Sequence, residues 1–173
     1  MRLLHYIEQG GPIMYILLFL NVVGFALMIY KFYILSNEKN KVEERAENLR
    51  ENLSQKIGTT TDPNIVIEMS NQEISTSMKQ MEKGLNTIKI IASISPLLGL
   101  LGTVIGVLIA FQVMSRTGLN NPEHFAQGIS MALITTVGGL IVAIPHYIGH
   151  NYMLGMLDSL ENRLEKSLLA KIL

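Results

Sequence analysis

Two histidines and two threonines are the residues of this 173-residue sequence whose types and spacing best suit chemistry. His146 and His150 are four residues apart, which places both on one face of a helix, as in many metal sites. A third ligand is not evident, and the segment between them lacks the glutamate of a zinc-protease motif. We therefore expect these histidines to lie at the mouth of a pore or among lipid headgroups, with no bound metal.

The sequence lacks the residues that several other kinds of chemistry need. The chain has no Cys, which excludes a thiol nucleophile and a zinc-thiolate site. Lys plus Arg and Asp plus Glu number 14 each, so the sequence lacks the basic excess of a nucleic-acid-binding protein. Ser130 and His146 are 16 residues apart on one predicted helix, about 24 Å, too far for a catalytic pair. We expect neither an enzyme nor a nucleic-acid partner.

Three uncharged stretches must position the histidines and the threonines. No Asp, Glu, Lys or Arg occurs in the 22 residues of 9–30, the 26 of 90–115 or the 34 of 124–157. Each stretch exceeds the roughly 20 residues that cross a bilayer as a helix. The sequence therefore predicts an all-α integral membrane protein with three transmembrane helices, extended by cytoplasmic helices. The expected spans are 12–30, which we interpret as a retained helix rather than a signal peptide, 92–113 and 126–147.

The basic residues predict the orientation of these spans. Nine of them lie in 31–89 and three in the tail, whereas the N-terminus has only Arg2 and the second connection only Arg116. The positive-inside rule then places the N-terminus outside and the C-terminus in the cytoplasm. The expected regions are 1–35, the periplasmic N-terminus with the first span; 36–91, a cytoplasmic helical loop; 92–147, the second and third spans with a short periplasmic turn; and 148–173, a cytoplasmic C-terminal helix.

Apolar residues at helical spacing predict that helices continue beyond the spans. The three stripes are Val42, Ala46, Leu49 and Leu53; Ile74, Met78, Met81, Leu85 and Ile88; and Met153, Leu157, Leu160, Leu164 and Leu168. We expect the first helix to break at 58–61, a new one to begin at Asp62 and Pro63, and another at Asn121 and Pro122. The second stripe predicts a helix that runs directly into the second span. These stripes must pack on each other or on other copies of the chain.

Small residues form one stripe on each of the last two spans. The two sets are Ser95, Gly99, Gly102, Thr103, Gly106 and Ala110, and then Gly128, Ala132, Thr136, Gly139 and Ala143. Such stripes let helix backbones approach closely in lipid, so we assign Gly99, Gly102, Gly106 and Gly139 to helix packing and expect neighbouring copies to use them. Pro96 and Pro145 share a depth near the cytoplasmic mouth, where each favours a kink.

Thr103 and Thr136 lie about 11 and 10 residues into their antiparallel spans, so both hydroxyls are expected near the bilayer midplane. Each hydroxyl can either bond back to its own helix or contribute to a polar ring around a pore. Thr135 faces about 100° away from Thr136. No acidic or basic residue lies inside any span, so a proton-carrying carboxylate must come from another chain.

Residues 95–107 resemble the Pro-Leu-Leu-Gly-Leu-Leu-Gly-Thr-Val signature of the MotA/TolQ/ExbB proton-channel family. Residues 128–145 resemble its second signature, and the whole is similar to the ExbB/TolQ branch. The resemblance implies an inner-membrane homo-oligomer, usually of five copies, around an ExbD- or TolR-like single-span partner. A partner Asp then faces pore-lining Thr103 and Thr136. Protons are the coupling ion, no cofactor is needed, and a TonB- or TolA-like protein receives the work at the outer membrane.

One departure from the family pattern is Met131, where many relatives carry a glutamate. Its replacement leaves the partner Asp as the obvious proton site. Neither this position nor the short N-terminus decides between ExbB and TolQ. Two alternatives remain: a three-span scaffold that conducts no ions, and a flagellar-stator-like subunit.

Overall fold

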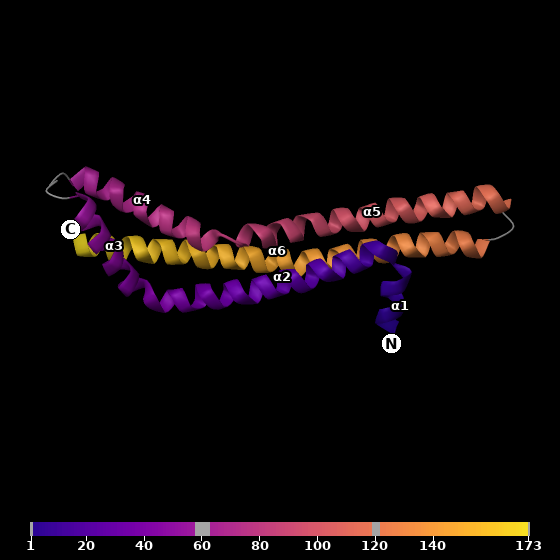
Figure 1. The fold of residues 1–173 in the computed structure, drawn as a ribbon, viewed down its shortest axis with the longest axis horizontal. Coiled ribbons are helices and arrows are strands. Elements are labelled where there is room, and N and C mark those ends of the chain that lie inside the picture. The colour runs from indigo at the N-terminus through magenta and orange to yellow at the C-terminus, as the bar shows by residue number, and fades with distance from the viewer. Residues whose placement is uncertain (1, 58–62, 119–121, 173) are drawn as a thin grey trace. The chain divides into compact units, whose positions relative to one another are not determined.

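The computed structural model describes residues 2–57, 63–118 and 122–172, and these residues are helical apart from short turns. The helices are α1 (Arg2–Gln9), α2 (Gly11–Glu38), the 3-10 helix η1 (Lys39–Lys41), α3 (Val42–Ile57), α4 (Pro63–Glu82), α5 (Leu85–Thr117) and α6 (Pro122–Ile172). Figure 1 follows them along the chain. No strand occurs in these described ranges, so the all-α prediction is confirmed.

Three helices are long and apolar enough to cross a membrane, as the uncharged stretches predict. The candidate spans are Gly11–Leu53, Leu85–Arg116 and Phe125–Ala170. These helices are longer than the predicted spans because a helix carries its own backbone hydrogen bonds and does not need to end where the lipid ends. In particular, α2 continues through η1 into α3, as the first apolar stripe predicts.

The chain divides into two compact units, and each is described by itself. The first comprises Met1–Leu27 and Thr87–Gly149, and the second comprises Met28–Asn86 and His150–Leu173. In the first unit, Ile13 and Leu17 of α2 pack with Ile91 of α5 and Val142 of α6. This apolar cluster holds three helices together and positions the groups described below.

The second unit buries the stripes that the sequence indicates. Ile74, Met78, Met81, Leu85 and Ile88 contribute one buried face, although Ile88 belongs by sequence to the first unit. All five apolar residues of the tail stripe, from Met153 to Leu168, are also buried. The stripes therefore have partners within a single chain.

Arg45 adds polar contacts to the second unit. It pairs with Glu38, and its guanidinium lies 3.5 Å from the Ser77 hydroxyl.

One helix prediction is wrong. The stripe from Ile74 to Ile88 does not lie on one helix that continues into the second span, because α4 ends at Glu82 and α5 begins at Leu85. Gly84 lies between them with a φ of 93°, a left-handed conformation that ends helices and favours glycine. The Lys31 ammonium donates a hydrogen bond to the Met81 carbonyl oxygen at 3.3 Å and so caps the end of α4. The apolar spacing continues in phase across this turn, which is why the pattern hides it.

Three predicted boundaries fall partly outside the described residues. The expected break at 58–61 and the capping residues Asp62 and Asn121 belong to the segments that are not described. The helices that follow begin at Pro63 and Pro122, the positions where proline suits the first turn of a helix.

Candidate functional site

The backbones of α5 and α6 touch along a seam of glycines in the first unit. A Cβ atom built on Gly106 would lie 2.8 Å from the Gly128 carbonyl oxygen, and one on Gly139 would lie 2.5 Å from the Ser95 carbonyl oxygen. Gly99 is equally confined, because its Cβ would lie 2.9 Å from the Thr135 carbonyl oxygen. Only glycine permits so close an approach.

The structure places these glycines in contacts within one chain. Gly102 faces Thr135, whose side-chain atoms would lie 2.4–2.8 Å from a Cβ at that position. Gly99, Gly102, Gly106 and Gly139 are all buried against the opposite helix of the same hairpin. These contacts lie within one chain, and the use of the same glycines by neighbouring copies stays a prediction. A stripe of small residues predicts close packing, but the pattern does not say which helix fills it.

Thr103 and Thr136 meet across this seam. Their hydroxyl oxygens are 2.5 Å apart and form a hydrogen bond, so the two residues are in direct contact. The Thr103 hydroxyl also lies 3.2 Å from the carbonyl oxygens of Gly99 and Ala132. The Thr136 hydroxyl lies 3.4 Å from the same two oxygens. Two hydroxyls and two carbonyls thus form one polar cluster, the threonine pair, between apolar helices.

The hydrogen-bond capacity of the threonine pair follows from counting donors and lone pairs. One hydroxyl donates to the other, and the second hydroxyl donates to a carbonyl. The first oxygen then keeps two free lone pairs and the second keeps one. The pair is therefore ready to accept a hydrogen bond from a neutral carboxylic acid or from water. It can donate to a carboxylate when a hydroxyl rotates away from its carbonyl.

Each hydroxyl contacts a carbonyl of its own helix and one of the facing helix, and a place in a polar ring around a pore stays a prediction. Thr103 and Thr136 are also half-buried, so the cluster is reachable from one side. Thr135 differs. It is fully buried against Gly102, and its hydroxyl donates to the Ala132 carbonyl oxygen of its own helix at 2.9 Å.

Pro96 and Pro145 are half-buried inside α5 and α6, and both helices continue past them. Each proline leaves the carbonyl four residues earlier without its helical donor. Ser95, beside the first proline, is fully buried and donates its hydroxyl hydrogen to the Ile91 carbonyl oxygen at 2.7 Å. The kinks at the cytoplasmic mouth remain a prediction.

His146 is not exposed on the surface of the first unit, and its expected place at headgroup level or at a pore mouth stays a prediction. Its ring is completely buried between α2 and α6, where it packs edge-on against Phe25 with ring centroids 4.9 Å apart. His150 is buried as well. Among the described residues, no group of three or more His, Cys, Asp and Glu side chains is arranged to hold a metal. Gly24 makes room for the His146 ring. The spacing of apolar residues along α2 gives no sign of this contact, so it was not predicted from the sequence.

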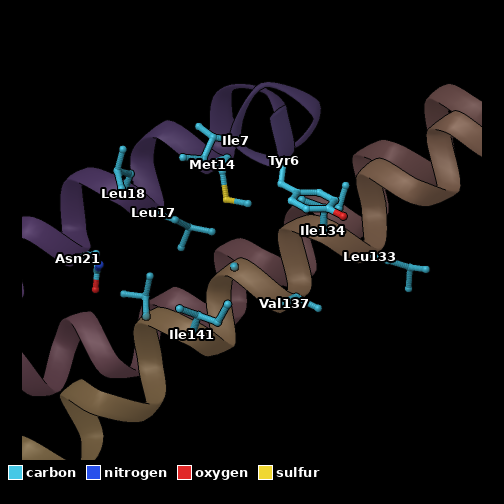
Figure 2. Close-up of a pocket in the computed structure, with 12 residues that line it drawn as sticks. Tyr6, Ile7, Met14, Leu17, Leu18, Asn21, Leu133, Ile134, Val137 and Ile141 are labelled. Carbon is cyan, nitrogen blue, oxygen red and sulfur yellow. The ribbon is translucent and has the colours of Figure 1, made fainter. Parts of the chain in front are cut away.

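Two hollows border the helices of the first unit. One of about 620 Å³ lies beside the end of the glycine seam near Gly128, and its polar lining comes from Gln9, Glu123, Gln127 and Ser130. Met131 also lines it and reaches the Gly11 position, where a Cβ would lie 2.8 Å from the Met131 methyl group. The other hollow, of about 500 Å³, is bounded by α1, α2 and α6 and is almost wholly apolar (Figure 2).

The fold and the threonine pair define a multi-pass membrane protein with a polar cluster inside an apolar helical hairpin. Residues 38–166 match the MotA/TolQ/ExbB proton channel family. The chain belongs to this family, and within it the relatives below indicate the ExbB/TolQ branch. This is a family of proton channels rather than of enzymes.

Individual relatives agree with this assignment. The chain is 41% identical over 75 residues to the biopolymer transport protein ExbB of Aquifex aeolicus, a match that covers 43% of this chain and 51% of the relative. It is 39% identical over 90 residues to biopolymer transport protein exbB1 of Vibrio cholerae, covering 51% and 40%. It is 32% identical over 91 residues to the Tol-Pal system protein TolQ of Haemophilus influenzae, covering 53% and 40%. The matches thus span about half or less of these relatives.

Proposed function

We propose that this chain is the channel-forming subunit of an inner-membrane complex that uses the proton gradient to do mechanical work. The observation that carries the proposal is the threonine pair, a hydrogen-bonding cluster at the centre of a hairpin whose uncharged stretches hold no acidic or basic residue. A path for protons through a membrane normally needs a titratable group. The carboxylate therefore comes from a second protein, whose span lies beside Thr103 and Thr136.

The threonine pair suits both charge states of such a carboxylate. In the neutral state, the acid donates its hydrogen to a free threonine lone pair. In the ionised state, the acid accepts hydrogen bonds from rotated hydroxyls, which otherwise bond to the carbonyls of Gly99 and Ala132. A fixed charge at either position would hold the carboxylate in one state, whereas hydroxyls allow it to change state and move on.

The proposed partners follow the family assignment and the names of the relatives. We expect a homo-oligomer, with five copies in the ring, around an ExbD- or TolR-like single-span protein. The work then passes to a TonB- or TolA-like protein that reaches the outer membrane. The relatives named for biopolymer transport and for the Tol-Pal system support this class of work. Protons are the coupling ion, and no further cofactor is proposed.

The proposed orientation has the N-terminus outside and the C-terminus in the cytoplasm, because basic residues concentrate in 31–89 and in the tail. A reporter enzyme active only in the cytoplasm should therefore be active when it is fused after Leu173. A fusion after Arg116, in the second connection, should be inactive and serves as the control. Activity of the second fusion alone would reverse the orientation.

Cysteine cross-linking tests the proposed contact with the partner span. The chain has no Cys, so Thr136→Cys introduces a single thiol into the half-buried cluster. We expect this thiol to form a disulfide with a cysteine placed one helical turn from the partner's membrane carboxylate. Thr135→Cys is the matched control, because Thr135 is fully buried against Gly102 and should not cross-link.

Thr103→Cys is tested in the same way. If the Thr103→Cys and Thr136→Cys complexes assemble with the partner but neither forms the disulfide, the result favours the scaffold alternative. The scaffold differs in one measurable respect, since it carries the partner without placing its carboxylate at the threonine pair. Cross-linking from Thr135→Cys alone would also contradict the proposed geometry.

A further inference from the structure

A hollow with three basic residues lies in the second unit, between η1, α3 and the end of α6. Its volume is about 650 Å³, and its polar lining comes from Lys39, Asn40, Glu43, Arg163, Lys166 and Ser167. Among the described residues, none makes an ion pair with the three cations. Glu43 already has an interaction within the chain. We call this surface, which the proposed proton path does not use, the basic hollow.

The same stretch of α6 carries a row of carboxylates on another face. Asp158, Glu161 and Glu165 follow each other at spacings of three and four residues, so they lie side by side along the helix. Like charges at these spacings repel one another, and no ion pair with a described residue offsets the repulsion. Asp158 is exposed, and the two glutamates are half-buried. These three residues, the acidic row, form a surface that cations from outside the chain would stabilise.

The acidic row and the basic hollow lie on opposite sides of the buried face of α6. Leu164 is fully buried and lies near the centre of that face. At about 100° per residue, the acidic row lies roughly 60–120° to one side of Leu164, and Arg163 and Lys166 lie roughly 100–160° to the other. No acid of the row is three or four residues from Arg163 or Lys166, the spacings at which side chains pair on one helix. The two sets therefore do not pair within one helix.

The basic hollow is expected to lie beyond the reach of lipid headgroups. The expected third span ends at residue 147, and Arg163 follows it by 16 residues, about 24 Å along the unbroken helix α6. The headgroup layer extends only about 5–8 Å on each side of the hydrocarbon core. A protein surface of opposite charge is therefore a better occupant of the hollow than a lipid.

We infer that the basic hollow binds the acidic row of a neighbouring copy of this chain. The inference rests on the proposed homo-oligomer and names one surface through which its copies meet. Identical copies share one orientation in the membrane, so a rotation about the membrane normal relates them and leaves every residue at its height. Groups that pair between copies must therefore lie at equal heights. Glu165 lies between Arg163 and Lys166 in sequence, and Glu161 lies about 3 Å from the level of Arg163, so the condition is met.

This contact joins two different surfaces of the chain, an arrangement that forms a ring when the rotation closes. Three carboxylates of one copy then face three cations of the next. Exposed ion pairs contribute modestly to stability, so the contact mainly determines which surfaces meet, while the membrane spans supply most of the packing.

Cysteine cross-linking between two differently tagged copies tests this contact. The chain has no Cys, so each variant carries one thiol and any link joins two copies. Membranes that contain Glu165→Cys and Lys166→Cys copies together should give a doubly tagged product with a short bis-maleimide, which replaces the length of the lost side chains. The matched controls combine each variant with a differently tagged copy of itself. Their yields should be about threefold lower or less, because like surfaces do not meet.

Charge reversal separates an ion-pair contact from simple proximity. Arg163→Glu in the Lys166→Cys copy should lower the cross-linking yield about threefold, an effect of the size that exposed ion pairs give. Glu161→Lys in the Glu165→Cys copy should restore the yield, because the pair is rebuilt with its charges exchanged. A loss that the second change does not restore would contradict the pairing.

The remaining outcomes separate this contact from the homo-oligomer itself. Control yields equal to the mixed yield would show that like surfaces meet, and would overturn the inference. Copies that co-purify through their tags but give no link in any combination would overturn it and leave the homo-oligomer intact. The same holds if Lys166→Cys links only to the single-span partner. Copies that do not co-purify at all would contradict the homo-oligomer and, with it, this contact.

Discussion

Replacing Thr103 or Thr136 with valine is expected to lower proton-driven work by about tenfold or more while the complex still assembles. Valine keeps the shape of threonine and removes only the hydroxyl. At each position it breaks the hydroxyl–hydroxyl contact and the contacts with the Gly99 and Ala132 carbonyls. Hydrogen bonds to a charged group contribute about 1.5–3 kcal/mol, which corresponds to a rate loss of roughly 10- to 150-fold.

The measurement is growth that depends on the complex, scored together with co-purification of the partner. Thr135→Val is the matched control, since this hydroxyl bonds within α6 and does not belong to the pair. It should reduce activity much less. If Thr103→Val and Thr136→Val complexes assemble and keep full activity, the threonines are packing residues and the proton path lies elsewhere.

Gly106→Leu is expected to destabilise the α5–α6 hairpin by about 3 kcal/mol or more, because overpacking against a backbone leaves little room for relaxation. A Cβ at this position would lie 2.8 Å from the Gly128 carbonyl oxygen and 3.0 Å from the Ala132 backbone nitrogen. Gly102→Leu should also be destabilising, since a Cβ there would lie 2.4–2.8 Å from side-chain atoms of the fully buried Thr135. The loss acts on the single chain first, and assembly falls as a consequence.

Thermal unfolding in detergent, followed by circular dichroism, measures this effect. Gly155→Leu provides a closely matched control, because Gly155 lies on α6 with no atom within 4 Å of a Cβ position. Leucine is the better helix former, so this variant should be as stable as the unmodified chain or more so. Equal unfolding temperatures for Gly106→Leu and Gly155→Leu would show that the seam is not close-packed in the membrane.

Much of the fold could be predicted from the sequence because the membrane imposes a simple rule. The lengths of the three uncharged stretches identify the spanning helices, and helical spacing identifies the buried stripes. The turn at Gly84 was not predicted, because Met81 and Leu85 keep the apolar spacing in phase on both sides of it. A single glycine with positive φ does not change the spacing of the apolar residues around it.

The site was partly accessible to the same reasoning. Equal depth on antiparallel spans predicted that Thr103 and Thr136 share a level, but their direct contact depends on how far the glycines let α5 approach α6. The burial of His146 depends on Gly24, which lies more than a hundred residues earlier in the chain. Contacts between distant segments are set by side-chain volumes on both helices, and a pattern read along one segment does not contain them.

Proton flux into liposomes is the measurement that tests the central claim most directly. The unmodified chain should be reconstituted alone, with its single-span partner, and with a partner whose membrane aspartate is changed to asparagine. The account predicts proton flux only for the chain with the unmodified partner. The reason is that residues 90–115 and 124–157, which include the threonine pair, contain no acidic residue. Equal flux from the chain alone, or from the complex with the asparagine partner, would contradict it.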